Sequence, residues 1–251
     1  TEGELASHLV GKGRMEEPEK IFDLIDRYFK GRESMTGKNV LITAGPTREK
    51  IDPVRYISNY STGKMGIALA EEAAARGAEV TLVLGPVERR PDNPRIRTVD
   101  VESAKEMLNA CEATFPECDM AIMCAAVADY AIANPADKKI KREKAGLPEL
   151  EFVKNPDIAA TLGKIKRPGQ MLVGFALETD NETENAAEKM KRKNLDMIVM
   201  NSLRDKGAGF GTDTNKITIF KADGSREEFG LKSKRAVAAD ILDEIGNIEA
   251  I

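Results

Sequence analysis

The order of apolar segments along the chain is the feature that most limits its fold. Short apolar runs of strand length alternate with longer segments whose apolar residues recur at helical spacing. The strand-like runs cover residues 38–45, 79–85, 96–101, 119–126, 171–176 and 195–201. The helical segments cover residues 64–78, 103–115, 155–165, 181–194 and 232–245. This alternation predicts βαβ units around a parallel sheet.

The pattern changes at both ends of the chain. Residues 215–230 hold two alternating runs around Asp223–Gly224, which is typical of a β-hairpin. Residues 16–31 carry apolar residues at helical spacing and predict one more helix. The predicted fold class is α/β: a doubly wound, mostly parallel, Rossmann-like sheet with helices on both faces and an antiparallel hairpin near the C-terminus.

Composition excludes several classes of partner. The chain has 251 residues, with 38 Lys and Arg against 42 Asp and Glu, so no basic excess points to nucleic acid. No apolar run approaches the roughly 20 residues of a membrane helix, and we expect no membrane partner. The three cysteines form no C-x-x-C pair, so neither a zinc site nor a disulfide framework is indicated. Reduced thiols fit a cytoplasmic location.

Histidine usage restricts the chemistry further. The only histidine is His8, and we interpret it as a bystander in the N-terminal stretch. Catalytic triads that need a histidine are therefore excluded, as are His-rich metal sites. A reaction on this chain would rely on positioning and on stabilising charge.

A long glycine-bounded loop, residues 45–63, precedes the first predicted crossover helix and ends in "STGKMG". Loops at the carboxyl ends of parallel strands bind ligands, and the N-terminus of the following helix favours an anion. The nucleotide-binding candidates of this loop are Gly45, Ser61, Thr62, Gly63 and Lys64. The loop is not a Walker motif, because Ser58 replaces its first glycine and Met65 follows the lysine. The alternative interpretation is that "STGKMG" is only a helix start with tight packing.

Tyr60 and Lys64 have the spacing of the Tyr/Lys pair of short-chain dehydrogenases. This makes an NAD(P)-dependent short-chain-type oxidoreductase the alternative function. No G-x-G-x-x-G follows the first predicted strand, which weighs against that alternative.

Two further stretches carry candidate residues. In "CAAVADY", residues 124–130, Ala125 and Ala126 allow a base or ribose to approach the backbone, and Asp129 suits ribose hydroxyls. A packed strand end with a capping Asp is the alternative. The stretch "DKKIKREKAG", residues 137–146, is either a solvated surface or a lid over a triphosphate. Its cations are Lys138, Lys139, Lys141, Arg142 and Lys144.

Together these stretches resemble the phosphopantothenoylcysteine synthetases, the second half of the bifunctional coenzyme A biosynthesis proteins. The matching segments are "ITAGPTREKIDPVRYISNYSTGKMG", "GAEVTLVLGPV", "CAAVADY", "KIKRE", "VKNPDIAATLG", "VGFALET" and "KNLDMIVMNSL". The leader resembles the tail of the partner decarboxylase. We therefore expect residues 1–36 to be a linker from a preceding flavoprotein domain and residues 37–251 to be the ligase domain.

The resemblance implies a reaction and its participants. A nucleoside triphosphate, CTP more than ATP, would activate 4'-phosphopantothenate with Mg²⁺ present and release pyrophosphate. L-cysteine would then attack the acyl-nucleotide to give the amide. The resemblance also implies a homodimer and a fused or associated flavin-dependent decarboxylase. A noncatalytic nucleotide-binding module is a third hypothesis, against which the cation run and the Asn59 loop weigh.

The resemblance also assigns roles to residues. It places Asn59 in the cysteine-dependent half-reaction, where its amide would donate to the developing oxyanion, and Lys139 in a mobile lid. These two are the expected catalytic residues. It places Asp129 near the ribose. The aromatic residues expected near the nucleotide are Phe175 and Phe210, and Arg55 is expected, with Asn59, to bind the acid substrate.

Overall fold

The structure is a computed structural model. It describes residues 33–141, 149–178, 182–202, 207 and 209–249, and of the N-terminal stretch residues 2–4, 10–12, 15, 17–19 and 21–22. There, β1 (Glu2–Glu4) pairs antiparallel with β2 (Val10–Lys12). His8 and most of the helix predicted for residues 16–31 lie outside the described residues. The domain boundary after residue 36 stays a prediction.

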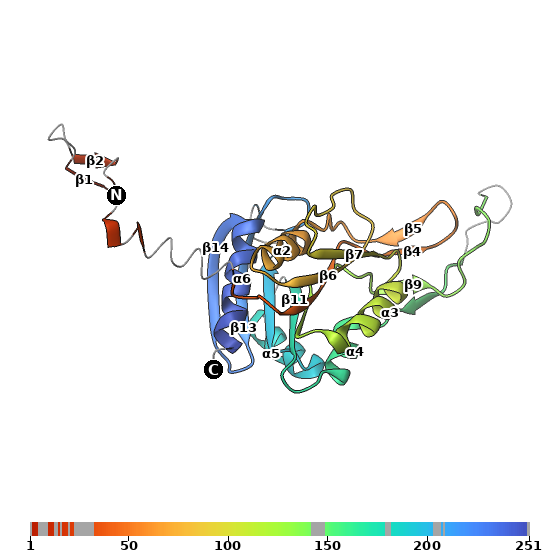
Figure 1. The fold of residues 1–251 in the computed structure, drawn as a ribbon. Coiled ribbons are helices and arrows are strands. Elements are labelled where there is room, and N and C mark those ends of the chain that lie inside the picture. The colour runs from red at the N-terminus through yellow and green to blue at the C-terminus, as the bar shows by residue number, and fades with distance from the viewer. Residues whose placement is uncertain are drawn as a thin grey trace.

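An eight-stranded sheet forms the centre of the protein (Figure 1). Its strands, in spatial order, are β14 (Arg226–Ser233), β13 (Thr214–Lys221), β12 (Met197–Ser202), β11 (Met171–Glu178), β8 (Met120–Met123), β3 (Asn39–Ala44), β6 (Glu79–Leu84) and β7 (Ile96–Asp100). The strands from β12 to β7 are all parallel. β13 is antiparallel to both neighbours, and the turn to β14 contains Gly224 at φ 87°. The predicted fold class is confirmed, including the C-terminal hairpin.

Helices cover both faces of this sheet. On one face lie α2 (Lys64–Ala75) and α6 (Lys234–Glu249), which pack on each other. On the other face lie α3 (Ala104–Thr114), α4 (Ile158–Ile165) and α5 (Glu182–Lys193), with the 3₁₀ turn η1 (Phe115–Glu117) after α3. Successive side chains of a strand point to opposite faces of the sheet, so each strand contributes to the core on both sides. In β3, Val40 and Ile42 belong to the core under α2, whereas Leu41 belongs to the core that contains Met107 of α3.

The helix starts follow local sequence signals. Ser103 caps α3 by accepting the N–H of Glu106 at 3.2 Å. Asp157 caps α4 by accepting the N–H of Ala160 at 3.0 Å. α2 differs, because its N-cap is Gly63, at φ 73°, and no side chain caps it. The first turn of α2 therefore presents backbone N–H groups without a side-chain acceptor.

Two small hairpins extend from the sheet, and neither was predicted. β4 (Arg48–Lys50) pairs with β5 (Tyr56–Ser58) inside the long glycine-bounded loop, and β9 (Tyr130–Ile132) pairs with β10 (Phe152–Lys154). They lie against each other at the right of Figure 1. We call the described residues of 48–58 and 130–154 the arm. Strands of three residues carry too little alternation for a sequence pattern to reveal them.

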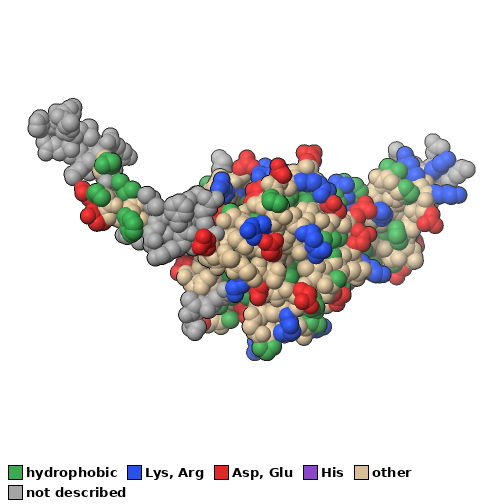
Figure 2. All heavy atoms as spheres, viewed as in Figure 1, with side chains coloured by type: hydrophobic (Ala, Val, Ile, Leu, Met, Phe, Trp, Pro, Cys, Tyr) green, Lys and Arg blue, Asp and Glu red, His purple; other side chains and the backbone are tan. Residues whose placement is uncertain are grey.

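A buried carboxylate fixes the arm to the body. Glu49 is 5% exposed, and its Oε1 accepts the N–H of Ala104 at 2.9 Å, at the start of α3. The backbone N–H of Arg48 donates to the carbonyl of Glu102 at 2.7 Å. Charged side chains of both signs are mixed over the body in Figure 2, and Lys and Arg gather at the tip of the arm. Lys138, Lys139 and Lys141 are exposed there, whereas Arg142 and Lys144 lie outside the described residues.

Candidate active site

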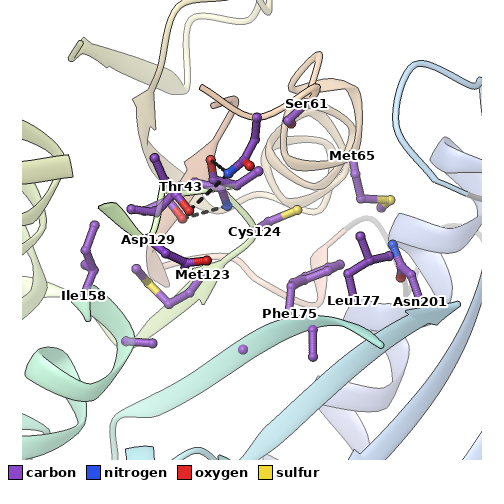
Figure 3. A pocket seen from close by; sticks show the side chains of 18 of the residues that line it. Thr43, Ser61, Met65, Met123, Cys124, Asp129, Ile158, Phe175, Leu177 and Asn201 are labelled. Carbon is purple, nitrogen blue, oxygen red and sulfur yellow. Dashed lines mark hydrogen bonds between the residues drawn. The ribbon is translucent and has the colours of Figure 1, made fainter. Parts of the chain in front are cut away.

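A cavity of about 720 Å³ opens where the sheet topology reverses direction, at the carboxyl ends of β3, β8 and β11 (Figure 3). Such a switch point is the usual ligand site of an open parallel sheet. Most of the predicted site residues line it. They are Asn59, Ser61, Thr62, Gly63, Lys64, Ala125, Ala126, Asp129, Phe175 and Phe210.

Three predicted residues do not line the cavity. Gly45, at φ 80°, lies behind it, and its carbonyl accepts the N–H of Ala126 at 2.9 Å. Arg55 lies on the arm, where it pairs with Asp52. Lys139 is exposed near the tip of the arm. Gly45 thus supports the loop beside the cavity, and the two cations lie on the projecting hairpins.

The N-terminus of α2 forms one wall of the cavity. Ser61, Thr62 and Gly63 lead into it, and the N–H of Gly63 donates to the Ser61 Oγ at 3.3 Å. Gly66, one turn on, faces β3, and a Cβ built there would lie 2.5 Å from the Cβ of Ala44. This close packing brings the uncapped end of α2 beside the strand end, where its partial positive charge favours an anion.

Two lysines strengthen that positive field. The Lys64 Nζ lies 3.0 Å from the Gly211 carbonyl and 2.7 Å from Asp213 Oδ1. The Lys234 Nζ contacts the carbonyls of Gly209, at 3.2 Å, and of Thr212. Burial lowers the pKa of Lys234, and the charge on Lys64 lowers it further. Two cations at the first residues of α2 and α6 therefore face the same cavity, which suits a polyanionic ligand.

Asn59 ties the loop before α2 to the loop after β8. Its Nδ2 donates to the carbonyls of Ala126, at 3.0 Å, and Val127, at 3.1 Å. A side-chain amide has two N–H donors, so both are used, and the Oδ1 is the atom left to meet a ligand. Donation to an oxyanion would require one of these bonds to break.

Two buried threonines accept hydrogen bonds from the loop after β8. The N–H of Ala125 donates to Thr43 Oγ1 at 3.1 Å, and the N–H of Ala128 donates to Thr47 Oγ1 at 3.0 Å. Both threonines are at most 1% exposed. These bonds fix the backbone that leads to Asp129. Thr43 lies beside Asp129 in Figure 3. Sequence reasoning missed them, because a threonine at a strand end has no distinctive pattern.

Cys124 lines the cavity without being a nucleophile at neutral pH. Burial raises the pKa of its thiol to about 12. The thiol therefore stays protonated, whereas the thiolate is the reactive form. Covalent catalysis through this residue is not supported.

Several lining residues were not predicted. Lys189 and Lys193 lie four residues apart on α5, a spacing that places both on one helix face. The Lys193 Nζ lies 3.0 Å from Asp157 Oδ2. Their i, i+4 spacing was readable in "EKMKRK", but only the sheet order brings α5 to this cavity. Lys154 and Asn155 also line it, and the Asn155 Nδ2 donates to the Ala128 carbonyl at 2.8 Å.

Asn201, at the end of β12, provides a further polar atom. Its Oδ1 is buried and has no hydrogen-bond partner among the described residues. The side chain lies at the cavity beside Phe175 and Leu177 in Figure 3. A buried acceptor of this kind is stabilised when a ligand or water donates to it.

The described residues contain no group of three or more His, Cys, Asp or Glu side chains arranged to hold a metal ion. Within the same part of the chain, no helix combines the length and apolar character needed to cross a membrane.

Comparison with known proteins gives the family. The family described as "DNA/pantothenate metabolism flavoprotein C-terminal domain" matches residues 35–248. The chain belongs to this family. A crystal structure of the C-terminal domain of the coenzyme A biosynthesis bifunctional protein CoaBC has the same fold, with a TM-score of 0.74 at 42% identity. The likeness covers 87% of this chain and 98% of that one.

Two curated relatives are longer than this chain. The coenzyme A biosynthesis bifunctional protein CoaBC of Bacillus subtilis (strain 168) is 46% identical over 247 residues, which are 98% of this chain and 60% of that protein. A cysteine/cysteine sulfinic acid decarboxylase of an unknown prokaryotic organism is 56% identical, over 97% of this chain and 68% of that protein. The names of both relatives therefore describe whole proteins of which this chain matches a part.

Proposed function

We propose that this chain is the phosphopantothenate–cysteine ligase domain of coenzyme A biosynthesis. It joins 4'-phosphopantothenate and L-cysteine at the expense of a nucleoside triphosphate. The observation that carries the proposal is a lysine-rich cavity at the sheet's switch point in a chain of the CoaBC C-terminal family. A site without histidine suits this chemistry, which needs charge neutralisation and alignment more than covalent catalysis.

The first step is activation of the acid. A carboxylate oxygen of 4'-phosphopantothenate attacks the α-phosphorus of the nucleotide, and the bond from that phosphorus to the pyrophosphate oxygen breaks. The N-terminus of α2 and the cations Lys64 and Lys234 favour the negative charge that builds up on the phosphates. Ser61 and Thr62 add hydroxyl donors. Lys139 of the arm is assigned to the same step, as a lid cation.

The second step forms the amide. The amine nitrogen of cysteine attacks the acyl carbon, the carbon–oxygen bond to the nucleotide breaks, and the nucleoside monophosphate leaves. We assign Asn59 to this step. Its Nδ2 is held by the Ala126 and Val127 carbonyls, which orients the amide at the cavity. In this conformation its Oδ1 can accept a hydrogen bond from the incoming amine. To donate to an oxyanion, Nδ2 would have to break its bond to the Ala126 or the Val127 carbonyl.

The remaining assignments concern the nucleotide. Asp129 is proposed to accept from the ribose hydroxyls, with Phe175 and Phe210 beside the nucleotide, and Ala125 and Ala126 allow its close approach. We favour CTP over ATP. Mg²⁺ is proposed to arrive bound to the nucleotide phosphates and water, as is usual for this ion.

We also propose that the chain works as a homodimer formed through the arm. Several exposed apolar side chains lie on its two hairpins, and exposed apolar surface beyond scattered single residues commonly marks an interface. They are Val54, Tyr56, Tyr130, Phe152 and Val153. Because Arg55 and Asn59 lie on or beside the same hairpin, a second copy docked there would border the cavity. Fusion to a flavin-dependent decarboxylase and a cytoplasmic location complete the proposal.

The oxidoreductase alternative is not favoured. Tyr60 is 91% exposed and does not line the cavity, whereas Lys64 lines it and is bound to Asp213. The two side chains thus do not share a site in the way that a Tyr/Lys catalytic pair requires. The relatives of this chain include the CoaBC protein of Bacillus subtilis and the C-terminal domain of a CoaBC protein. A noncatalytic module is disfavoured by the number of cations that converge on the cavity.

One assay tests the proposed function. Protein is mixed with Mg²⁺, 4'-phosphopantothenate, cysteine and either CTP or ATP, and pyrophosphate is followed. We expect release that depends on the acid substrate and is faster with CTP. Folded protein that releases no pyrophosphate with either nucleotide would refute the ligase. Release without the acid would point instead to simple nucleotide hydrolysis.

Lys139→Gln tests the assigned lid cation. Loss of one positive charge near the phosphates should slow pyrophosphate release about 100-fold, as removal of a stabilising donor does elsewhere. Lys138→Gln is the matched control, since both lysines are exposed neighbours on the arm. Circular dichroism should be unchanged in both. Equal rates for the two variants would show that Lys139 is only a surface residue.

A further inference from the structure

Asp52 is a buried carboxylate in the turn of the β4–β5 hairpin. Its side chain has 0% exposure, although Pro53, Val54 and Arg55 beside it are exposed. A charge buried in a projecting hairpin is costly unless it is fully hydrogen-bonded. The partners of Asp52 therefore define what it does.

The two carboxylate oxygens have different partners. Oδ1 accepts the backbone N–H groups of Val54, at 2.8 Å, and Arg55, at 2.9 Å, which closes the turn locally. Oδ2 accepts the Arg55 guanidinium through Nε, at 3.0 Å, and through Nη2. Oδ2 also accepts the N–H of Ile140 at 3.1 Å, from a segment 88 residues away. The second oxygen therefore joins two parts of the arm that are distant in sequence.

Arg55 completes the link from its own side. Its Nη2 donates to the Ile140 carbonyl at 3.1 Å, so both backbone polar groups of Ile140 are bound by the Asp52–Arg55 pair. The N–H of Ala136 donates to the carbonyl of Ile51 at 2.9 Å and adds a second crossing point. The Arg55 side chain stays 47% exposed, and its Nη1 has no partner among the described residues. One edge of the guanidinium is thus fixed and another faces outward.

The bond to Ile140 matters because of its neighbour. The peptide group whose N–H meets Asp52 is the one between Lys139 and Ile140. Holding that peptide sets where the Lys139 side chain begins. The same carboxylate thus orients the cation assigned to the acid substrate and the backbone that carries the cation assigned to the nucleotide.

We propose that Asp52 is a positioning residue which holds Arg55 and the Lys139–Ile140 peptide as one unit, so that the cations for the two substrates keep a fixed separation. This inference rests on the proposed function, because the roles of Arg55 and Lys139 come from it. In-line attack needs the acid and the nucleotide in fixed relative geometry, and small misplacements of such groups cost large factors in rate.

Asp52→Asn is the test variant. The asparagine Oδ1 can still accept the N–H groups of Val54 and Arg55, but its Nδ2 cannot accept from Arg55 or Ile140. Glu49→Gln is the matched control. It removes another buried charge from the same hairpin, and its amide oxygen can keep the bond to Ala104 without touching Ile140.

The first measurement needs no activity. Amide hydrogen exchange at Ile140 should be about tenfold faster in Asp52→Asn, the effect of losing one hydrogen bond of typical net strength. In Glu49→Gln it should stay at the wild-type rate. Wild-type exchange at Ile140 in Asp52→Asn would overturn the positioning role, whether or not the protein is a ligase.

The second measurement uses the ligase assay on the full chain. Asp52→Asn should raise the KM for 4'-phosphopantothenate about tenfold and lower the rate of pyrophosphate release about tenfold, because the Arg55 guanidinium and the Lys139–Ile140 peptide both lose their hydrogen bonds to Oδ2. Glu49→Gln should stay within about twofold of wild type. Asp52→Asn combined with Arg55→Gln should bind the acid no worse than Arg55→Gln alone, since the two act as a unit. Wild-type kinetics for Asp52→Asn in an active enzyme would refute the inference, whereas an inactive wild-type protein would refute the proposed function.

Ile140→Pro keeps the inference testable if Asp52→Asn does not fold. It removes the N–H that Asp52 accepts and leaves Asp52 and Arg55 intact. Slower pyrophosphate release with an unchanged KM for the acid is expected, because only the Lys139 side of the unit is released. Unchanged kinetics in this variant would also count against the proposal.

Discussion

Asn59 is the residue whose geometry most narrows its chemical role. Its amide joins the loop before α2 to the Ala126 and Val127 carbonyls. Replacing its Nδ2 with an oxygen would turn two hydrogen bonds into contacts between acceptors, which repel. The loop after β8 would then lose one of its supports at the point where cysteine is proposed to attack.

Asn59→Asp should therefore separate the two half-reactions. We expect pyrophosphate release to remain within about tenfold of wild type, while amide product falls by about 100-fold or more, the size of effect seen when one positioned transition-state group is lost. Both products can be measured in one reaction by mass spectrometry, so the pyrophosphate signal is the internal control. A normal yield of amide would remove Asn59 from the second step.

The pKa of Asp52 predicts how the stability of the fold depends on pH. The Arg55 guanidinium beside it holds the pKa well below its usual range; burial opposes this, and three backbone N–H groups reinforce it. Because the folded pKa is lower than the unfolded value of about 3.9, the ionised group stabilises the fold above that value. The contribution declines as pH falls from the unfolded value towards the lower folded pKa.

The melting temperatures of wild type and Asp52→Asn should thus differ by a constant amount from about pH 5 to pH 8 and converge below about pH 4. Thermal unfolding followed by circular dichroism across this range measures the difference. Glu49→Gln provides the comparison for loss of a buried carboxylate in general. A difference that grows as the pH falls would contradict the predicted direction of the pKa shift.

At the scale of the element, the position of α2 depends on one glycine. Gly66 lies so close to β3 that a Cβ would sit 2.5 Å from the Cβ of Ala44 and 3.0 Å from the Thr43 carbonyl. Since β3 is central in the sheet, the helix would have to move away from it. That movement would carry the uncapped helix end away from the cavity.

Gly66→Ala should destabilise the fold by about 1–3 kcal/mol, the typical cost of overpacking. It should also weaken nucleotide binding. Gly246→Ala is the matched control in α6, because nothing lies within 4 Å of its added Cβ. That change should stabilise by about 0.5–1 kcal/mol, since alanine is the better helix former. Urea unfolding measures both, and equal effects would show that the contact with Ala44 is easily relieved.

For the molecule as a whole, the exposed apolar side chains of the arm are where a second copy of the chain is proposed to bind. Phe152 is 57% exposed and Tyr130 is 50% exposed on the two strands of one hairpin. A second copy would remove these side chains from water and bring another Asn59 loop near each cavity. Assembly and activity would then depend on the same surface.

Phe152→Glu should weaken the proposed dimer at least tenfold, because a charge would be buried in an apolar contact. Sedimentation velocity over a concentration series measures the effect. Leu231→Glu is the matched control, as Leu231 is 51% exposed on β14, away from the arm. A wild-type protein that sediments as a monomer at all concentrations would refute the homodimer.

The sequence by itself determined the sheet, its helices and the nature of the loops at the cavity. Runs such as residues 38–45 and 79–85 are mostly apolar over the length of one strand, which is typical of a strand buried on both faces in a parallel sheet. "STGKMG" and "CAAVADY" follow such strands, and loops in that position meet at one edge of the sheet. Local pattern was enough here, because burial and periodicity are properties of adjacent residues.

Tertiary structure alone decided which distant groups share the site. The sheet order brings Lys189, Lys234 and Asn201 to the same cavity, although their local sequences do not show that they meet there. The hydrogen bond between Asp52 and the N–H of Ile140 likewise joins residues 88 positions apart, in the connections of two hairpins whose strands are too short to predict. Hydrogen bonds and charges act through space, so their partners become known only when the chain has folded.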